Sequence, residues 1–336
     1  MPDFALATRE MSAMAGSAAR RTAAVDYSVV IPVFNEEEGL PALWERLSAA
    51  LDKLDGPSEA VFVNDGSKDG TLDGLKRLRA SDPRVKIISF SRNFGHQTAI
   101  SAGMDYSSGS AVIVIDADLQ DPPELIPDMI EKWREGYEVV YAVREKREGE
   151  SRFKLLTAAL FYRLLRRLTN VDIPVDVGDF RLMGRRALDA LCGMRERHRF
   201  VRGMVSWVGF PQTGVKYQRS ARFAGETKYP LKKMVKFAFD GITSFSWVPL
   251  KLASYFGLIA AIISFLVVVW ALYVKFILRD AIPGWSSLIV AVMAVASVQF
   301  LTLWIVGEYL GRIYDEVRQR PLYIIGEAHG FSGDDR

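Results

Sequence analysis

The sequence predicts an α/β fold, with a mostly parallel sheet covered by helices on both faces, followed by a membrane-associated part. Up to about Tyr229, short apolar runs alternate with amphipathic stretches, which is typical of strand–helix–strand units. Residues 252–310 are apolar apart from one short polar interruption. The overall composition of the 336 residues is 49% hydrophobic and 25% charged, and it hides this difference between a mixed, charged first part and an apolar second part.

Four strand–helix units are expected in order along the first part of the chain. Residues 29–33 form an apolar strand, and the stretch LPALWERLSAALDKL forms the helix that follows it. The same pattern begins again at Glu59, at Val85 and at Ser110, with loops of a few residues between strand and helix. Sheets built from such units bind their ligands at the carboxyl ends of the strands.

Polar clusters follow the last apolar residue of three of these strands, and they read FNEEE, NDGSKDG and DADLQD. Each cluster taken alone fits a turn or a helix cap, because Asn, Asp, Ser and Gly favour both. Together they share one edge of the sheet, where their like charges repel one another unless a cation binds. The sequence therefore predicts a cation-dependent site at this edge.

Asp116 and Asp118 are two residues apart, so in strand geometry they point the same way. Gln120, two further on, adds a carbonyl oxygen. Ligands that are all oxygen suit a hard divalent cation, Mg²⁺ or Mn²⁺, whose remaining positions go to water and substrate phosphates. These three residues are the predicted metal ligands.

Asp65 follows another strand and offers only hydrogen-bond acceptors. Such a group can take the imide N–H of uracil or the equivalent donors of guanine, whereas adenine has no imide. A uridine or guanosine donor is therefore favoured. The sequence has neither a Gly-x-x-x-x-Gly-Lys-Ser/Thr loop nor a Gly-x-Gly-x-x-Gly turn, which disfavours an ATPase or a dinucleotide-dependent dehydrogenase.

Composition narrows the class of partner. The net charge of +3 is too small to indicate nucleic acid, and Lys and Arg gather near the apolar segments, which favours a membrane surface. The single cysteine, Cys192, cannot form an internal disulfide. Residues 1–25 lack the apolar core of a secretory signal and are expected to be a flexible leader.

Six stretches of the sequence, in order, resemble the motifs of the family 2 inverting glycosyltransferases that load sugars onto polyprenyl phosphates. They are VVIPVFNEEEGL, VFVNDGSKDGT, SFSRNFGHQTAISAGMDYSSG, VIVIDADLQDPPE, VDVGDFRLM and RFAGETKYPLKKM. The resemblance is greater to bacterial bactoprenol glucosyltransferases than to dolichyl-phosphate mannose synthase. It implies a Rossmann-like glycosyltransferase A-type domain at 26–229.

The resemblance also implies roles for individual residues. Asp179, in VGDF, is placed beside the acceptor phosphate and the anomeric carbon of the sugar; read without the family, it is an ordinary loop aspartate. Asp116 is placed at the ribose and metal, and Asp118 and Gln120 at the metal on the diphosphate. The residues implied to line the nucleotide-sugar pocket are Pro32, Asn35, Glu36, Asp65, Ser67 and Asp116.

An acceptor phosphate and a donor diphosphate together carry more negative charge than one divalent metal neutralises. Additional cations are therefore expected, and arginine suits bidentate phosphate contacts. The candidates are Arg144, Arg152, Lys154, Arg222 and Lys228. For any one of these, a solvated surface position remains an open alternative.

Two runs, 252–278 and 287–310, each exceed the roughly 20 residues that a helix needs to cross a bilayer. The connector RDAIPGWS is too short for a domain, so the runs are expected to form a transmembrane hairpin. Residues 230–250 read as an amphipathic interfacial helix. Lys and Arg flank the hairpin on its outer ends, which predicts a multi-pass inner-membrane protein whose catalytic domain, termini and tail at 312–336 are cytoplasmic.

Gly307 and Gly311 form a Gly-x-x-x-Gly spacing in the second run, which permits close approach of two helices. A homo-oligomer, such as a tetramer, is therefore an open alternative to a monomer. Glu308, between these glycines, requires a partner or the membrane interface.

The resemblance implies transfer of a hexose from a nucleotide sugar to undecaprenyl phosphate, with UDP-glucose as the expected donor, for modification of a cell-envelope glycan such as lipopolysaccharide. The donors GDP-mannose, UDP-N-acetylhexosamine and aminoarabinose stay open. A processive polysaccharide synthase is disfavoured because two membrane runs make no obvious pore and the Gln-x-x-Arg-Trp motif is absent. A membrane sugar-lipid binding or assembly subunit is the non-enzyme alternative.

Overall fold

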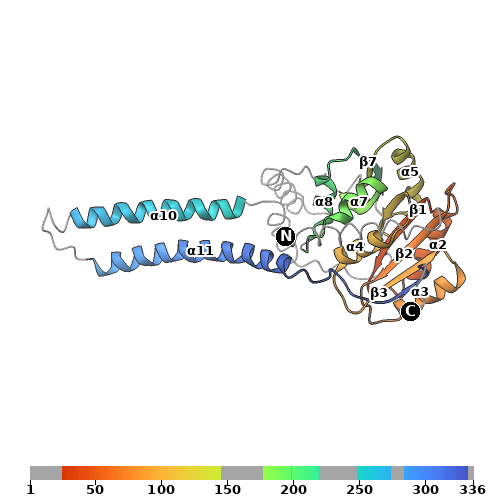
Figure 1. Ribbon diagram of the computed structural model, residues 1–336, viewed down its shortest axis with the longest axis horizontal. Coiled ribbons are helices and arrows are strands. Elements are labelled where there is room, and N and C mark those ends of the chain that lie inside the picture. The colour runs from red at the N-terminus through yellow and green to blue at the C-terminus, as the bar shows by residue number, and fades with distance from the viewer. Residues whose placement is uncertain (1–24, 145–176, 198, 219–247, 274–283, 332–336) are drawn as a thin grey trace, which may run out of the picture.

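The computed structural model describes residues 25–144, 177–197, 199–218, 248–273 and 284–331. Within these residues the chain forms a sheet domain and a pair of long helices that extend away from it (Figure 1). Most of the predicted leader and of the predicted interfacial segment lies outside the described residues. The same is true of four of the five predicted acceptor-binding cations, namely Arg152, Lys154, Arg222 and Lys228.

The sheet has eight strands within the described residues, in the order β7-β5-β6-β4-β1-β2-β3-β8. Strands β1 to β4 are parallel to one another, β5 is parallel to β7, and β6 and β8 are antiparallel to their neighbours. The prediction of an α/β fold with a mostly parallel sheet is therefore confirmed. The strands span Tyr27–Val33 (β1), Ser58–Asn64 (β2), Val85–Phe90 (β3), Ala111–Val114 (β4), Val139–Arg144 (β5), Val177–Gly184 (β6), Gln212–Tyr217 (β7) and Ile325–His329 (β8).

Helices cover both faces of the sheet. Alternate side chains of each strand point to opposite faces, and because apolar side chains lie on both, each face packs against helices. In β1, Ile31 belongs to the core on one face and Val30 to the core on the other. The first face carries α2 (Leu40–Leu51), α3 (Thr71–Ser81), the short 3₁₀ turn η1 (Pro123–Leu125) and α5 (Ile126–Arg134). The second carries α4 (His96–Tyr106), α7 (Arg185–Gly193) and α8 (Val201–Trp207).

Helix α4 lies unusually close to β1. A Cβ placed on Gly103 would overlap the Cγ1 atom of Val30, so only glycine permits this approach. Because α4 is fixed against the sheet, its first residues, His96 and Gln97, are held at the carboxyl edge of the strands.

Helices α10 (Val248–Tyr273) and α11 (Trp285–Val317) lie side by side (Figure 1). Within the described residues, the segment Ala291–Val317 is long and apolar enough to cross a membrane. Helix α10 begins within the predicted interfacial segment, and α11 continues seven residues beyond the predicted end at 310. The last turns of α11 carry charge, and Arg312 pairs with Glu308, its Nε 3.1 Å from Oε1, which supplies the partner that Glu308 was expected to require.

Beyond α11 the chain returns to the sheet, which the sequence did not predict. Strand β8 pairs antiparallel with the edge strand β3, with Ile88 opposite Ala328 and Ser89 opposite Glu327. The run is five residues long and contains Gly326, so it lacks the apolar alternation that marks a strand in a sequence.

Candidate functional site

Two loops at the carboxyl edge are joined by hydrogen bonds. The backbone N–H of Asn35 donates to Ser67 Oγ at 2.9 Å, and the N–H of Lys68 donates to Asn35 Oδ1 at 2.9 Å. Asn35 has φ 55°, a left-handed conformation that asparagine tolerates better than most residues. The N–H of Glu36 donates to Thr71 Oγ1, at 3.0 Å. The structure thus brings together three of the residues predicted to line the nucleotide pocket, while Pro32 lies inside β1.

Asp65, 3% exposed, holds the loop between β3 and α4. Its Oδ1 accepts the N–H of Phe94 at 2.6 Å and its Oδ2 accepts the N–H of Gly95 at 3.0 Å. Burial raises the pKa of Asp65 in spite of these bonds. The Asp65 carboxylate, which was predicted to accept a hydrogen bond from the base, therefore already accepts hydrogen bonds from the backbone. Each oxygen keeps a second lone pair.

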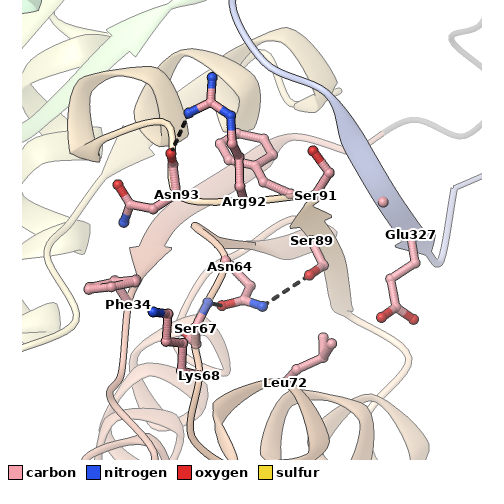
Figure 2. A pocket seen from close by; sticks show the side chains of 13 residues that line it. Phe34, Asn64, Ser67, Lys68, Leu72, Ser89, Ser91, Arg92, Asn93 and Glu327 are labelled. Atoms are coloured by element: carbon pink, nitrogen blue, oxygen red, sulfur yellow. Dashed lines mark hydrogen bonds between the residues drawn. The ribbon is translucent and has the colours of Figure 1, made fainter.

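A pocket of about 670 Å³ opens between β2, β3 and β8, and Figure 2 shows its side chains. Asn64 lies at its centre, where its amide donates to Ser89 Oγ at 3.0 Å and its Oδ1 accepts the N–H of Ser67 at 3.1 Å. Other residues on its wall are Phe34, Lys68, Arg92, Asn93, Gly326 and Glu327. Of the predicted nucleotide residues, Ser67 lines this pocket directly.

Asp116, two residues beyond β4, lies near Asp179 of the neighbouring strand β6. Strand β4 pairs with β6 with Val114 opposite Arg181, and continuing that register by two residues brings Asp116 opposite Asp179. His96 lies between the two carboxylates, with Nε2 3.4 Å from Asp116 Oδ1 and 3.4 Å from Asp179 Oδ2. Burial lowers the pKa of His96, but the two carboxylates outweigh it and raise the pKa above its ordinary value.

Asp179 is held as a carboxylate by cations and by an amide. Arg202 contacts both oxygens, with Nε 2.9 Å from Oδ1 and a terminal nitrogen 3.1 Å from Oδ2. Gln97 Nε2 lies 3.4 Å from Oδ2, and a terminal nitrogen of Arg181 lies 3.8 Å from Oδ1. Burial alone would raise the pKa of this side chain, which is 7% exposed, but Arg202, His96 and Arg181 hold it well below its usual range.

Asp116 has the opposite character. Its Oδ1 is buried and accepts no hydrogen bond from the described residues. Burial, followed by the charges of Asp179, Asp121 and Asp118, raises the pKa of Asp116 to about 6, although His96 opposes this. A buried carboxylate oxygen that contacts His96 at 3.4 Å and has other carboxylates nearby is a place where a divalent cation would relieve both the desolvation and the repulsion.

The predicted metal ligands fit such a cation only in part. The N–H of Gln120 donates to Asp118 Oδ1 at 3.1 Å, so these two residues form a turn directly beyond Asp116. The described residues contain no preassembled group of three His, Cys, Asp or Glu side chains for a metal. A site of this kind suits Mg²⁺ or Mn²⁺, which take one or two carboxylates and complete their shell with water and phosphate oxygens.

Arg144, the predicted acceptor-binding cation that the structure describes, lies at the end of β5. Its Nε is 3.2 Å from the hydroxyl of Tyr217, which in turn donates to Asp121. A Cβ on Gly178 would lie 2.8 Å from a terminal nitrogen of Arg144, so this side chain passes close to the strand that carries Asp179. Burial raises the pKa of Tyr217 to about 12, which keeps its proton in place.

Sequence reasoning missed the side chains that surround Asp179. His96 and Gln97 follow the third strand at the same edge as the acidic clusters, so their position in the chain could have indicated them. Arg202 carries no such signal, because it begins a short helix 23 residues after Asp179, and no local pattern relates the two.

The chain is similar in sequence to known proteins. A model of the family described as glycosyl transferase family 2 matches residues 28–192. The chain is 56% identical over 306 residues to YkcC, an uncharacterized glycosyltransferase of Bacillus subtilis (strain 168), covering 91% of this chain and 95% of the relative. It is 43% identical over 302 residues to a bactoprenol glucosyl transferase of Shigella phage SfII, covering 90% and 98%.

Among solved structures, the chain is similar to glucosyl-3-phosphoglycerate synthase from Mycobacterium tuberculosis, crystallised with Mn²⁺, UDP-glucose and phosphoglyceric acid. The two are 21% identical, with a TM-score of 0.44, and the match covers 67% of this chain and 78% of that one.

Proposed function

This chain belongs to glycosyl transferase family 2, and we propose that it transfers glucose from UDP-glucose to undecaprenyl phosphate at the cytoplasmic face of the membrane. Its identity to bactoprenol glucosyl transferases over about nine tenths of its length supports a glycosyltransferase with a polyprenyl phosphate acceptor. The observation that carries the proposal is the pair of carboxylates Asp116 and Asp179, bridged by His96. The pocket of about 670 Å³ that Ser67 lines supports a nucleotide site.

In the reaction we propose, an oxygen of the acceptor phosphate attacks the anomeric carbon in line. A bond forms between that phosphate oxygen and the anomeric carbon as the bond from the carbon to the diphosphate oxygen breaks, the nucleoside diphosphate leaves, and the configuration inverts. Asp179 lies where it can orient the acceptor and offset positive charge that develops on the sugar. Because Arg202 keeps Asp179 ionised, this carboxylate is a weak proton acceptor and a good electrostatic partner.

A divalent cation belongs to this proposal, held by Asp116, Asp118 and the Gln120 carbonyl oxygen. When bound, it would neutralise charge on the leaving diphosphate. Asn35, Glu36 and Ser67 order the loops after β1 and β2, and Asp65 orders the loop after β3. Their contribution is therefore to fix the position of the donor before the sugar is transferred.

The acceptor phosphate would be bound by Arg144 together with Arg152, Lys154, Arg222 and Lys228. Arg144 supports this assignment by its position at the edge of the sheet beside the strand of Asp179. Its bond to Tyr217 fixes the guanidinium without neutralising it. A fixed arginine is suited to a phosphate that approaches from the membrane side.

For the membrane, we propose that α10 and α11 both cross it as a hairpin with the catalytic domain and both termini in the cytoplasm. The apolar segment Ala291–Val317 and the apolar composition of α10 support this arrangement. A homo-oligomer remains part of the proposal. At Gly307 and Gly311, no atom of the described residues lies within 4 Å of the position that a Cβ would take, which leaves room for another helix.

The test is a donor panel with the purified full chain, undecaprenyl phosphate and either Mg²⁺ or Mn²⁺. Lipid-linked sugar and released nucleoside diphosphate are followed with UDP-glucose, GDP-mannose, UDP-N-acetylglucosamine and UDP-aminoarabinose as donors. We expect transfer with UDP-glucose at a kcat/KM at least about tenfold above the others, a difference of about 1.4 kcal/mol in transition-state binding. Transfer from another donor alone would move the donor assignment to that sugar, and transfer from none would contradict the proposal.

A further inference from the structure

The segment that follows α11, residues 318–331, is called the C-terminal strap here because it returns from the membrane helix to the catalytic sheet (Figure 1). At the end of α11, Glu316 Oε1 accepts the backbone N–H of Arg197 at 2.6 Å. Further on, the N–H of Ser91 donates to the carbonyl of Ile324 at 3.0 Å, and β8 pairs with β3. The strap thus connects α11 with β3, the strand that leads into the loop at residues 91–95.

Aromatic side chains fix the strap from both of its ends. The ring of Tyr323 stacks on Phe90, the last residue of β3, with centroids 5.2 Å apart and planes 16° apart. Its hydroxyl donates to Asp105 Oδ2 at 2.9 Å, near the end of α4. Phe331 packs edge to face against Tyr106, at 5.3 Å. The strap therefore contacts both elements that flank the loop at residues 91–95.

The strap also forms part of the pocket wall. Gly326 and Glu327 line it on the β8 side, and Ser67, Lys68 and Asn93 line it elsewhere (Figure 2). Glu327 Oε2 lies 2.8 Å from Lys76 Nζ and 2.9 Å from His329 Nε2. These two partners lower the pKa of Glu327, so it is a carboxylate at neutral pH.

We propose that the C-terminal strap is part of the nucleotide-sugar site, with Gly326 and Glu327 as the wall against the nucleoside and Tyr323 as a positioning residue for the loop at 91–95. Lys76 and His329 pair with Oε2 of Glu327, and the carboxylate still has lone pairs that can accept N–H or O–H donors of a base and ribose. The nucleoside is therefore placed against β8, and the diphosphate is held at Asp116 and Asp118 through the divalent cation of the proposed function, because those carboxylates alone would repel it. This inference rests on the proposed function.

The first experiment adds bulk at Gly326 and measures UDP binding by calorimetry on the full chain in detergent. A Cβ at Gly326 would lie 3.5 Å from Ser89 O and 3.6 Å from Ser91 Cα, which is ordinary contact, so a Cβ fits there without displacing the backbone. Along the series Gly326→Ala, Gly326→Leu and Gly326→Phe, we expect the Kd for UDP to rise progressively, reaching at least about tenfold. The matched control is Gly193→Phe, at a position with nothing within 4 Å of its Cβ.

The second experiment separates positioning from folding. For Glu327→Ala and Tyr323→Phe, we expect the KM for the nucleotide sugar to rise about three- to tenfold while the KM for polyprenyl phosphate and kcat stay within about twofold. A merely structural role would reduce the amount of active enzyme and leave both KM values unchanged. Glu135→Ala, at an exposed carboxylate, is the control.

The outcomes distinguish this inference from the proposed function. If the wild-type chain binds UDP and the Gly326 and strap variants keep its Kd and KM, the strap is not part of the site and only this inference is overturned. If a Gly326 variant is too unstable to measure, the Glu327→Ala and Tyr323→Phe kinetics decide in the same way. If the wild-type chain binds neither UDP nor GDP, the proposed function is overturned and this inference with it.

Discussion

Arg202 binds Asp179 through both carboxylate oxygens, at 2.9 Å and 3.1 Å, and this contact joins α8 to β6 at the centre of the candidate site. The Asp179 side chain is buried, at 7% exposed, while that of Arg202 is 27% exposed. A bidentate contact fixes the plane of the carboxylate as well as its charge. The orientation of Asp179 therefore depends on Arg202.

The first prediction follows from that dependence. Arg202→Lys keeps the charge but not the two-point contact, and we expect kcat to fall about 10- to 100-fold, the scale of a misplaced group in an otherwise intact site. Steady-state kinetics with saturating donor and acceptor measure this. Arg186→Lys, at an exposed arginine, is the matched control and should behave as wild type. Equal activity of the Arg202 and Arg186 variants would show that Asp179 needs no such support.

A second prediction concerns the divalent cation. Asp118→Asn removes a charged oxygen ligand, and we expect it to abolish most transfer and to raise the metal concentration needed for half-maximal activity by at least about tenfold. Excess chelator should stop the wild-type enzyme, and added Mg²⁺ or Mn²⁺ should restore it. Asp128→Asn, on the outer helix α5, serves as the control. Full transfer by protein shown to be metal-free by elemental analysis would contradict the assignment.

Much of the sheet was predictable because the signal for it is local. Residues 29–33 and the three later strands are apolar runs with turn residues directly after them, and the structure places strands there. The convergence of Asn35, Asp65 and Asp116 on one edge also follows from the parallel arrangement. A pattern of a few residues is sufficient for such features, because the strand and the loop after it are adjacent in the chain.

The rest depends on contacts between distant residues. Asp179 meets His96 only because β6 pairs with β4, and Arg202 reaches it from a helix whose packing no local pattern describes. Strand β8 comes more than 230 residues after β3, the strand it pairs with, and follows the two apolar helices in the chain. Its short polar sequence becomes a strand because the edge of β3 offers backbone partners, which is a tertiary effect rather than a propensity.

A third prediction tests the topology. A cysteine introduced as Pro283→Cys should react with an impermeant thiol reagent added outside intact cells, whereas Gly333→Cys should react only after the membrane is opened. The native Cys192 is replaced by serine in both variants, although burial raises the pKa of its thiol to about 12 and makes it slow to react. Reversed labelling would place the catalytic domain on the side opposite to the one we propose.

A fourth prediction concerns stability and is independent of the site. Glu59, 2% exposed, accepts bonds from the Ser108 N–H at 2.8 Å and from Ser28 Oγ at 2.5 Å, and pairs with Lys86. Burial raises the pKa of Glu59, but these partners together lower it below its ordinary value. Its contribution to stability is therefore present above the unfolded pKa, near 4.5, and is lost as the pH falls through the lower folded pKa.

We accordingly expect Glu59→Gln to lower the free energy of unfolding by about 2 kcal/mol at pH 7, because it leaves the ammonium of Lys86 without its partner. The difference from wild type should shrink as the pH falls below the ordinary pKa of a glutamate. Denaturant unfolding in detergent at several pH values measures both effects. Glu135→Gln, in an exposed pair with Lys132, should cost less than about 1 kcal/mol at every pH. A difference that does not change with pH would show that the charge of Glu59 is unimportant.

The last prediction asks whether Asp179 acts as a base. A general base matters when the nucleophile must lose a proton in order to react. A phosphate monoester, with a second pKa near 6, is already mostly dianionic at neutral pH. Asp179 is in addition a poor base, because Arg202 and His96 hold its pKa well below the usual range. We therefore expect Asp179 to act by orientation and by charge, and Asp179→Asn to lower turnover by about 10²-fold or more at every pH.

The measurement is the pH–rate profile of wild type and Asp179→Asn between about pH 5.5 and 8, the range that brackets the acceptor phosphate pKa, at saturating acceptor. Asparagine can still accept a bond from Arg202 but carries no charge, so the expected deficit is constant across the range. Asp172→Asn, at another aspartate of the same stretch of sequence, is the control. Recovery of the Asp179 variant to near wild-type turnover at high pH would identify Asp179 as a base, because the acceptor would then have lost its proton without help. An unimpaired variant would mean that the ion pair with Arg202 serves only to hold β6 and α8 together.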